Sequence, residues 1–177
     1  WSSDVCSSDL ITTVVPLFNP FTFDKLRAVG RLWGIVILCN IIGTALASLF
    51  FLTTHLFTPD IDKALDELAH HVGSFSATQN LLKGIMSGLL IAALVWMLPS
   101  VSNKFLLIFF MTYLIGLGDF THVVVGSTEM SYLVWQGEAS ISKYLFTFLI
   151  PTTIGNIIGG TGVFTLLIYG QVTEELE

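Results

Sequence analysis

The sequence has few charged residues, few basic residues and only two cysteines. Asp, Glu, Lys and Arg make up 11% of its 177 residues, whereas about 25% is usual for soluble domains, so there is too little polar side chain to coat a water-soluble globule. Seven Lys and Arg stand against 13 Asp and Glu, which excludes the basic surface of a nucleic-acid-binding protein. Cys6 and Cys39 give neither a disulfide framework nor a metal-ligand spacing, and Cys39 is expected to be a small packing residue. No metal, cofactor or nucleic-acid partner is predicted.

Residues 1–10 differ in composition from the apolar chain that follows them. They read WSSDVCSSDL, which looks like the conceptual translation of a sequencing adapter, and they are interpreted as an artefact, with a genuine polar N-terminus as the alternative. On the artefact interpretation the natural sequence begins near Ile11 and its upstream part is missing. Residues 11–31 contain Pro16 and Pro20 and are predicted to be a linker before the first span.

Uncharged stretches predict the membrane spans. They cover residues 32–59, 84–103, 105–118 and 144–173. A helix needs about 20 residues to cross about 30 Å of hydrocarbon, so the first and last stretches suffice, and the second does so with help from a snorkelling Lys83. Stretch 105–118 is too short for a straight crossing and leads into polar residues, which predicts a broken helix. The transmembrane domain is therefore expected to cover 32–173, followed by a tail at 174–177.

Charge is distributed unevenly around the first predicted span. Three basic residues lie in 25–31, whereas 59–71, predicted to be a loop, carries four acidic residues and one Lys. The positive-inside rule therefore places the start of this span in the cytoplasm. His55 is expected at the end of the span. His70 and His71 are interpreted as solvated loop residues rather than metal ligands, because no third ligand has a suitable spacing to them.

A short string is repeated in the first and last predicted spans. Asn-Ile-Ile-Gly begins at Asn40 and again at Asn156. An amide in hydrocarbon must find partners, and small neighbouring residues let other backbones approach to supply them; a structural packing notch is the alternative. Three crossings separate the two strings, so their helices run in opposite directions, as in inverted repeats of three spans each. The intact chain would then be an all-α polytopic membrane protein with six spans, about four of them visible here.

Segment 116–129 combines glycines with ionisable residues at membrane depth. An ionisable side chain costs at least about 2.5 to 3.5 kcal/mol at the bilayer centre, so one found there usually faces a cavity or a partner. His122 is the leading functional candidate, because an imidazole changes charge near neutral pH and can exchange a proton with a weak-acid anion. The alternative is a histidine whose two nitrogens are satisfied by neighbours. Asp119 is expected to tie down the break, and Glu129 to lie at its outer end.

A competing enzymatic motif begins at Gly116. Gly116 to Asp119 matches the Gly-x-Gly-Asp motif of intramembrane aspartyl proteases, in which two carboxylates share a proton. No second Asp lies inside a predicted span, and the Pro-Ala-Leu motif that should follow is absent, since Pro151 is followed by Thr152. An enzyme is therefore not expected, and no catalytic residue is predicted.

The last predicted span carries the most specific signature in the chain. Residues 149–160, LIPTTIGNIIGG, closely resemble the last-helix signature of the formate/nitrite transporter family, and two further features agree: LVWM before Pro99 and the position of His122 in FTH. The resemblance implies an aquaporin-like six-helix protomer with a pore through each subunit, assembled as a homopentamer. It also implies that His122 is the central pore histidine, which protonates or attracts small monovalent anions such as formate, nitrite or hydrosulfide.

Several positions depart from the usual family pattern. Thr121 stands where a Glu commonly precedes the histidine, Gly126 and Gly88 replace two common Asn residues, and Ile115 replaces a constricting Phe. These changes resemble the less understood YfdC-like branch of the family, and they leave the identity of the anion open.

The sequence thus predicts a multi-pass bacterial inner-membrane channel or transporter for small monovalent weak-acid anions. Two alternatives stay open: an aquaporin-like neutral-solute channel and a non-conducting membrane assembly module. The expected partners are the anion, the lipid bilayer and further copies of the chain, with no cofactor. The candidate transport and pore residues are His122, Ile115, Asn40, Asn156, Thr121 and Asp119.

Overall fold

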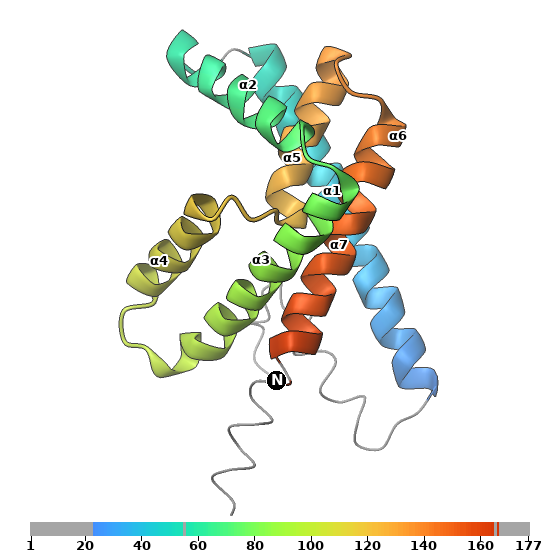
Figure 1. The fold of residues 1–177 in the computed structure, drawn as a ribbon, viewed down its shortest axis with the longest axis vertical. Helices are drawn as coiled ribbons and strands as arrows, with labels where there is room; N and C mark the ends of the chain where they lie inside the picture. Colours follow the sequence, from blue (N-terminus) through green and yellow to red (C-terminus); the bar gives the residue numbers. More distant parts are fainter. Residues whose placement is uncertain (1–22, 55, 165, 167–177) are drawn as a thin grey trace, which may run out of the picture. The chain divides into compact units, whose positions relative to one another are not determined.

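The computed structural model describes residues 23–54, 56–164 and 166, and every element in this part of the chain is helical (Figure 1). The chain divides into two compact units, residues 1–43 and 44–177, and each is considered by itself. The artefact interpretation of 1–10, most of the linker, His55 and the tail 174–177 lie outside the described residues and stay predictions.

Three of the described helical segments are long and apolar enough to cross a membrane. They are Leu26–Thr54, Ala77–Ser100 and Ile141–Val163, and the shorter apolar helix Lys104–Leu117 lies between the last two. The prediction of an all-α polytopic membrane protein is confirmed. The inverted repeat compares Asn40 with Asn156, which belong to different units, and it stays a prediction.

Helix α1 (Phe23–Thr54) begins in the first unit and ends in the second. It starts nine residues before the predicted span, so the prediction of a linker is wrong for residues 23–31, whose sequence FDKLRAVGR contains no proline and continues the helix. The helix stops before Pro59, the first residue of the next helix. Cys39 is exposed on α1 rather than packed. No signal in the sequence predicted this, because a helix that is apolar on all sides does not indicate which face is covered.

Helix α2 (Pro59–Gly73) replaces the loop predicted for residues 59–71. Proline suits the first turn, where its missing N–H would have had no partner, and acidic residues there and His70 and His71 in the last turn complement the helix dipole. Apolar residues recur at Ile61, Leu65, Ala69 and Val72, and the last two are buried where α2 packs on α5. The loop prediction was wrong because it rested on the many charged residues and did not take the helical spacing of the apolar residues into account.

Helix α3 (Ala77–Met97) continues into the short turn η2 (Leu98–Ser100). It begins earlier than predicted because Ser76 and Gln79 form a capping box, in which each side chain accepts a hydrogen bond from the backbone N–H of the other residue. The fourth span consists of α6 (Ile141–Lys143), η3 (Tyr144–Leu149), α7 (Ile150–Ile157) and η4 (Ile158–Val163).

Helices α3 and α7 lie side by side and form the most extensive contact between elements of the second unit (Figure 1). Glycines make this close approach possible: a Cβ on Gly88 would collide with the backbone of Asn156, and one on Gly159 would collide with the carbonyl of Ile85. Small residues spaced by four, such as Gly84 and Gly88 facing Gly155 and Gly159, are a common device for close helix packing in membranes.

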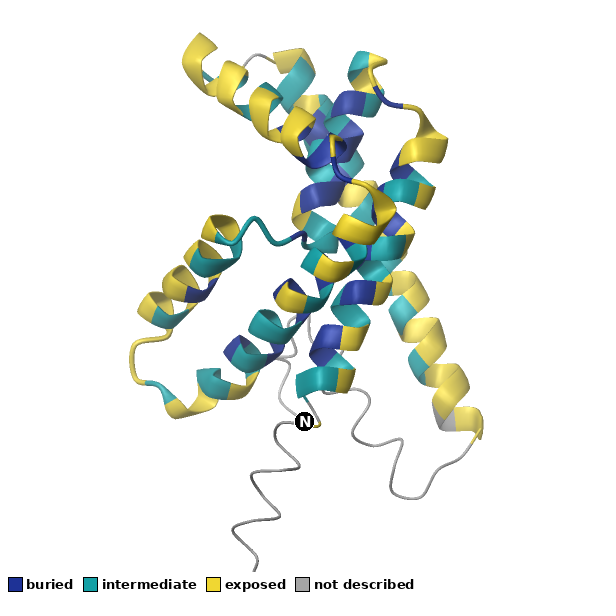
Figure 2. Ribbon diagram, in the orientation of Figure 1, coloured by how far each residue is buried: buried dark blue, intermediate teal, exposed yellow. Residues whose placement is uncertain are grey.

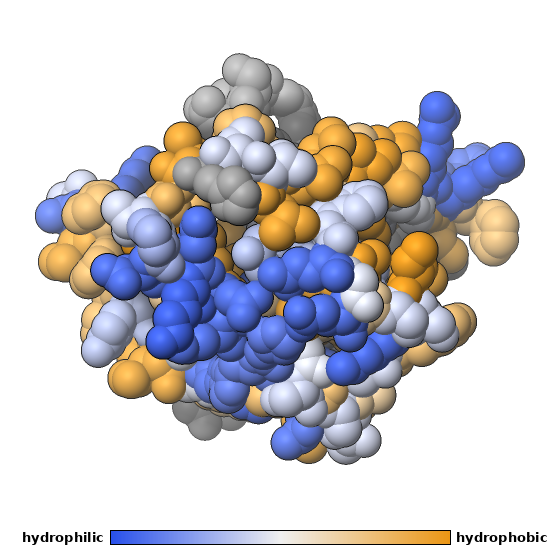
Figure 3. Space-filling model, turned by 90° about the horizontal axis from the view of Figure 1, so that it is seen from above, coloured by the Kyte–Doolittle hydropathy of each residue, from blue (hydrophilic) through white to orange (hydrophobic). Residues whose placement is uncertain are grey.

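The predicted broken helix is present as α4 (Lys104–Leu117) and α5 (Val123–Gln136), with residues 118–122 between them. Most residues of α4 are exposed, whereas α5 is largely covered by its neighbours (Figure 2). Seen from the end where α2 lies, hydrophilic residues gather in the middle of the view, with hydrophobic residues beside them (Figure 3). An apolar flank next to a polar end is the pattern expected of a chain that crosses a bilayer.

Candidate functional site

The break between α4 and α5 is built by a sharp change of backbone direction. Asp119 has a φ of 55°, in the left-handed region that only a few non-glycine residues tolerate. The N–H of Phe120 then donates to the carbonyl of Ile115 at 3.0 Å, which closes the end of α4. A Cβ on Gly118 would collide with the Phe120 ring, so a larger residue there would have to displace that ring. His122 has extended backbone and precedes the first residue of α5.

Asn156 on α7 holds the break in place. Its Oδ1 accepts a hydrogen bond from the Val123 N–H at 3.0 Å, and this donor at the start of α5 would otherwise lack a helical partner. Its Nδ2 lies 3.2 Å from the carbonyl oxygen of Thr121, 2.9 Å from that of Gly84 and 2.9 Å from the hydroxyl of Ser87. The amide thus joins α7, α3 and the break in one polar cluster, which is the partner set that an amide in hydrocarbon needs.

Thr121 belongs to the same cluster. Its side chain is buried and its hydroxyl donates to the carbonyl of Asn80 at 3.1 Å. Its own carbonyl accepts a 2.6 Å hydrogen bond from the hydroxyl of Ser87. The residue directly before His122 is therefore fixed at both its side chain and its backbone.

Asp119 connects the break to α2 and α3. Lys83 Nζ lies 2.7 Å from Asp119 Oδ2 and also donates to the Asp119 carbonyl at 2.9 Å, while His71 Nε2 lies 3.0 Å from Oδ1. Lys83 also lies 4.5 Å from the centre of the Phe75 ring. Lys83, expected to snorkel, lies inside the span Ala77–Ser100, and its ammonium group binds the Asp119 carboxylate. His71 is exposed, as predicted, but it lies on a helix rather than in a loop and contacts Asp119.

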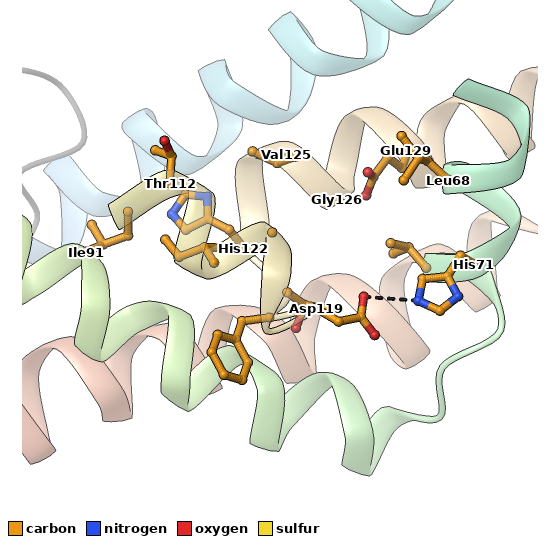
Figure 4. Close-up of a pocket in the computed structure, with 14 residues that line it drawn as sticks. Leu68, His71, Ile91, Thr112, Asp119, His122, Val125, Gly126 and Glu129 are labelled. Atoms are coloured by element: carbon orange, nitrogen blue, oxygen red, sulfur yellow. Dashed lines mark hydrogen bonds and ion pairs between the residues drawn. The ribbon is translucent and has the colours of Figure 1, made fainter. Parts of the chain in front are cut away.

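A cavity of about 380 Å³ lies beside the break, within the second unit (Figure 4). The break contributes Asp119, Phe120, Thr121 and His122; α4 contributes Thr112, Ile115 and Gly116; α5 contributes Val125, Gly126 and Glu129; α2 contributes Leu68, His71 and Val72; and α3 contributes Ile91. The lining is mainly apolar and has a few polar groups, which is typical of a site that holds a small molecule.

The structure brings together four of the six candidate residues predicted from the sequence. His122, Ile115, Thr121 and Asp119 all line the cavity. Asn156 is absent from the described lining and supports the break from behind. Asn40 lies on α1 in the first unit and is considered only there.

Two ionisable lining residues were not among those candidates. Glu129 was expected at the outer end of the broken segment, yet it lines the cavity together with His122. The sequence spacing could have predicted this position: Glu129 follows His122 by seven residues, which is about two helical turns, so both side chains are expected on the same side. His71 could not be found in this way, since its place depends on how α2 packs. Within the described residues, no group of three or more His, Cys, Asp or Glu side chains could hold a metal ion.

The sequence as a whole matches the model of one protein family, described as formate/nitrite transporter, over residues 3–170. The chain belongs to the formate/nitrite transporter family. It is 36% identical over 171 residues to the inner membrane protein YfdC of Escherichia coli, an alignment that covers 96% of this chain and 55% of that protein. It is also 37% identical over 93 residues to an uncharacterized transporter of Saccharomyces cerevisiae, covering 49% of this chain and 14% of the yeast protein.

The fold is also found among solved structures. A pentameric formate channel with formate bound has a TM-score of 0.69 to this chain at 21% sequence identity, and the match covers 82% of this chain and 67% of the channel. The predicted family and its fold are therefore confirmed. The chain spans little more than half the length of its Escherichia coli relative.

Proposed function

We propose that the complete protein is an inner-membrane channel or transporter for small monovalent weak-acid anions, and that His122 is the group that attracts or protonates them. The observation that carries this proposal is the position of His122, which lines a cavity at a break between two half-helices in a chain of the formate/nitrite transporter family. Irregular backbone at membrane depth is tolerated where it is buried in protein or lines a cavity, and binding sites of transporters often lie beside such breaks.

The chemistry of the lining agrees with a small weak acid as the permeant. An unaided anion crosses hydrocarbon poorly, but an imidazole changes charge near neutral pH, so it can attract the anion or supply a proton that neutralises it. Ile115 is the proposed apolar constriction, and the cavity volume of about 380 Å³ is ample for an anion of a few heavy atoms. Thr121 and Asn156 fix the backbone on both sides of His122 and so keep its ring in position.

The Escherichia coli relative is described as an inner membrane protein, and the solved structure of the same fold is a pentameric channel. Both descriptions support a homopentamer of the present protein in a bacterial inner membrane. Since the family transports small anions rather than transforming them, transport rather than catalysis is proposed.

The test is anion flux into proteoliposomes that contain the complete gene product. We expect His122→Asn to reduce the uptake of formate at least tenfold and to abolish its dependence on pH, because an amide neither carries charge nor exchanges a proton in this range. His70→Asn is the matched control: His70 is half exposed on α2, contacts Glu138 at 2.8 Å and does not line the cavity.

Equal uptake by wild type and His122→Asn across pH 5 to 8 would remove His122 from the mechanism. A wild-type flux that carries a neutral solute such as glycerol and ignores charge and pH would instead support the aquaporin-like alternative. A sealed pore in an intact oligomer would favour the assembly module.

A further inference from the structure

One ionisable side chain in the cavity has no role in the mechanism above. Glu129 is half-buried on α5, and its carboxylate lies on the side of the cavity near Leu68 and Gly126, with His122 toward the other end (Figure 4). Asp119, the other carboxylate in the lining, is bound by Lys83 and His71. Among the described residues, none forms a hydrogen bond or ion pair with the Glu129 side chain.

The charged groups around Glu129 do not neutralise it. On the cavity side it faces Asp119, a like charge, together with His71 and His122. Of the other elements packed on α5, η3 contributes one titratable group, Tyr144, and α7, whose sequence IPTTIGNI is uncharged, contributes none. Helix α2 also packs on α5, and its charged residues other than His71 lie outside the cavity lining: Asp60, Asp62, Lys63, Asp66, Glu67 and His70. Residues 44–54 of α1 in this unit also contain no titratable group.

An ionised carboxylate in this position conflicts with simple anion passage. A negative charge in a cavity with mainly apolar walls is screened weakly, so it repels any anion that enters. A weak-acid anion can take up a proton and pass as a neutral molecule, whereas the anion of a strong acid cannot. At a pH at which its carboxylate is ionised, Glu129 in the cavity therefore discriminates between these two kinds of anion.

We propose that Glu129 is a specificity-determining residue that excludes permanent anions and admits species that can be protonated. The proposal rests on the function proposed above. The permeating anion takes one proton, from water or from the His122 imidazolium, crosses beside Glu129 as the neutral acid, and returns the proton to water on the other side. Where His122 supplies the proton, water on the entry side reprotonates the imidazole. Each cycle therefore moves one anion and one proton together and leaves both side chains as they began.

The test compares formate with nitrate, two small planar anions of which only formate is the base of a weak acid. Uptake of each is measured at pH 8, so that Glu129 is ionised, in proteoliposomes of the complete gene product. We expect wild type to carry formate at least tenfold faster than nitrate. Glu129→Gln, which keeps the shape and removes the charge, is expected to raise nitrate uptake at least tenfold and to bring the two rates together. Glu129→Asp retains a carboxylate and is expected to keep the wild-type preference.

Glu138→Gln is the matched control, because Glu138 lies outside the cavity lining and contacts His70. It is expected to leave the ratio of formate to nitrate unchanged. The proposal is overturned if Glu129→Gln keeps the wild-type ratio, or if wild type carries nitrate as fast as formate. Equal uptake of nitrate and formate by wild type overturns the proposal even if the Glu129→Gln variant does not assemble. A wild type that carries neither anion refutes the proposed function itself, which is a different outcome.

Discussion

The side chain of Asp119 links three separate parts of the chain at the break. Its backbone is left-handed, and its carboxylate contacts Lys83 from α3 and His71 from α2. The Lys83 side chain is 24% exposed and Asp119 is 41% exposed, so water screens this pair only in part. A half-covered ion pair with direct hydrogen bonds couples its members more strongly than an exposed pair does.

This coupling is measurable with a double-mutant cycle on Asp119→Asn and Lys83→Gln. Asparagine tolerates left-handed backbone, so the cycle removes charge without adding strain. We expect a coupling energy of about 0.5 to 3 kcal/mol from unfolding of the purified protein in detergent. The control pair is Lys63 and Glu67 on α2, which are 3.8 Å apart with side chains 78% and 68% exposed; about 0.3 to 0.5 kcal/mol is expected there. Equal coupling in the two pairs would contradict a structural role for Asp119.

The sequence predicted which residues lie at the candidate site better than it predicted their contacts. His122 and Asp119 stood out because ionisable groups are rare in apolar segments, and Asn156 stood out because a buried amide needs partners. The partners themselves, such as the Val123 N–H for Asn156 and His71 for Asp119, come from other helices. Such contacts depend on tertiary packing, which no local pattern encodes.

At the scale of elements, the contact of α3 with α7 and η4 depends on the absence of side chains. A Cβ on Gly155 would collide with the carbonyl of Leu81, and one on Gly159 with that of Ile85. Both obstacles are backbone atoms in helices, which cannot move aside as a flexible side chain can. The close crossing also brings the Asn156 amide within hydrogen-bonding distance of Gly84.

Gly159→Ala is therefore expected to be strongly destabilising. Overpacking typically costs about 1 to 3 kcal/mol, and a backbone obstacle places this substitution at the upper end of that range. Gly162→Ala is the control within the same π-helical segment, because nothing in the structure lies within 4 Å of its added Cβ. Thermal unfolding in detergent should show a large fall in Tm for the first variant and little change for the second. Similar Tm values for the two variants would show that α3 and η4 do not pack as described.

Element boundaries followed from the sequence only where apolar runs were interrupted by turn residues. The short stretch 105–118 and the polar residues after it predicted the break, which lies between α4 and α5. The charged segment 59–71 was predicted to be a loop because its charge was weighed more heavily than its helical period, and it forms α2. Charge density alone does not distinguish an amphipathic helix from a loop.

At the scale of the whole molecule, the chain exposes apolar side chains that water would not tolerate. On α4 the rings of Phe105, Phe109 and Tyr113 stack along one face, with centroids 6.4 and 6.3 Å apart, and all three residues are more than half exposed. A helix of this kind requires lipid or another protein surface around it. We propose that the bilayer, neighbouring subunits and the further spans predicted for the intact chain cover this surface.

The homopentamer proposed above is expected to persist in mild detergent. Native mass spectrometry should give five times the protomer mass, because subunits related by closed symmetry assemble in a fixed number. Nonspecific association through exposed apolar faces would instead give a mixture of oligomer sizes. Co-expression of tagged and untagged copies is the control: assembly in the membrane yields mixed pentamers, whereas association after extraction of separately expressed copies does not. A monomer that retains anion flux would show that each protomer conducts by itself, and the exposed face of α4 would then be a lipid-facing surface.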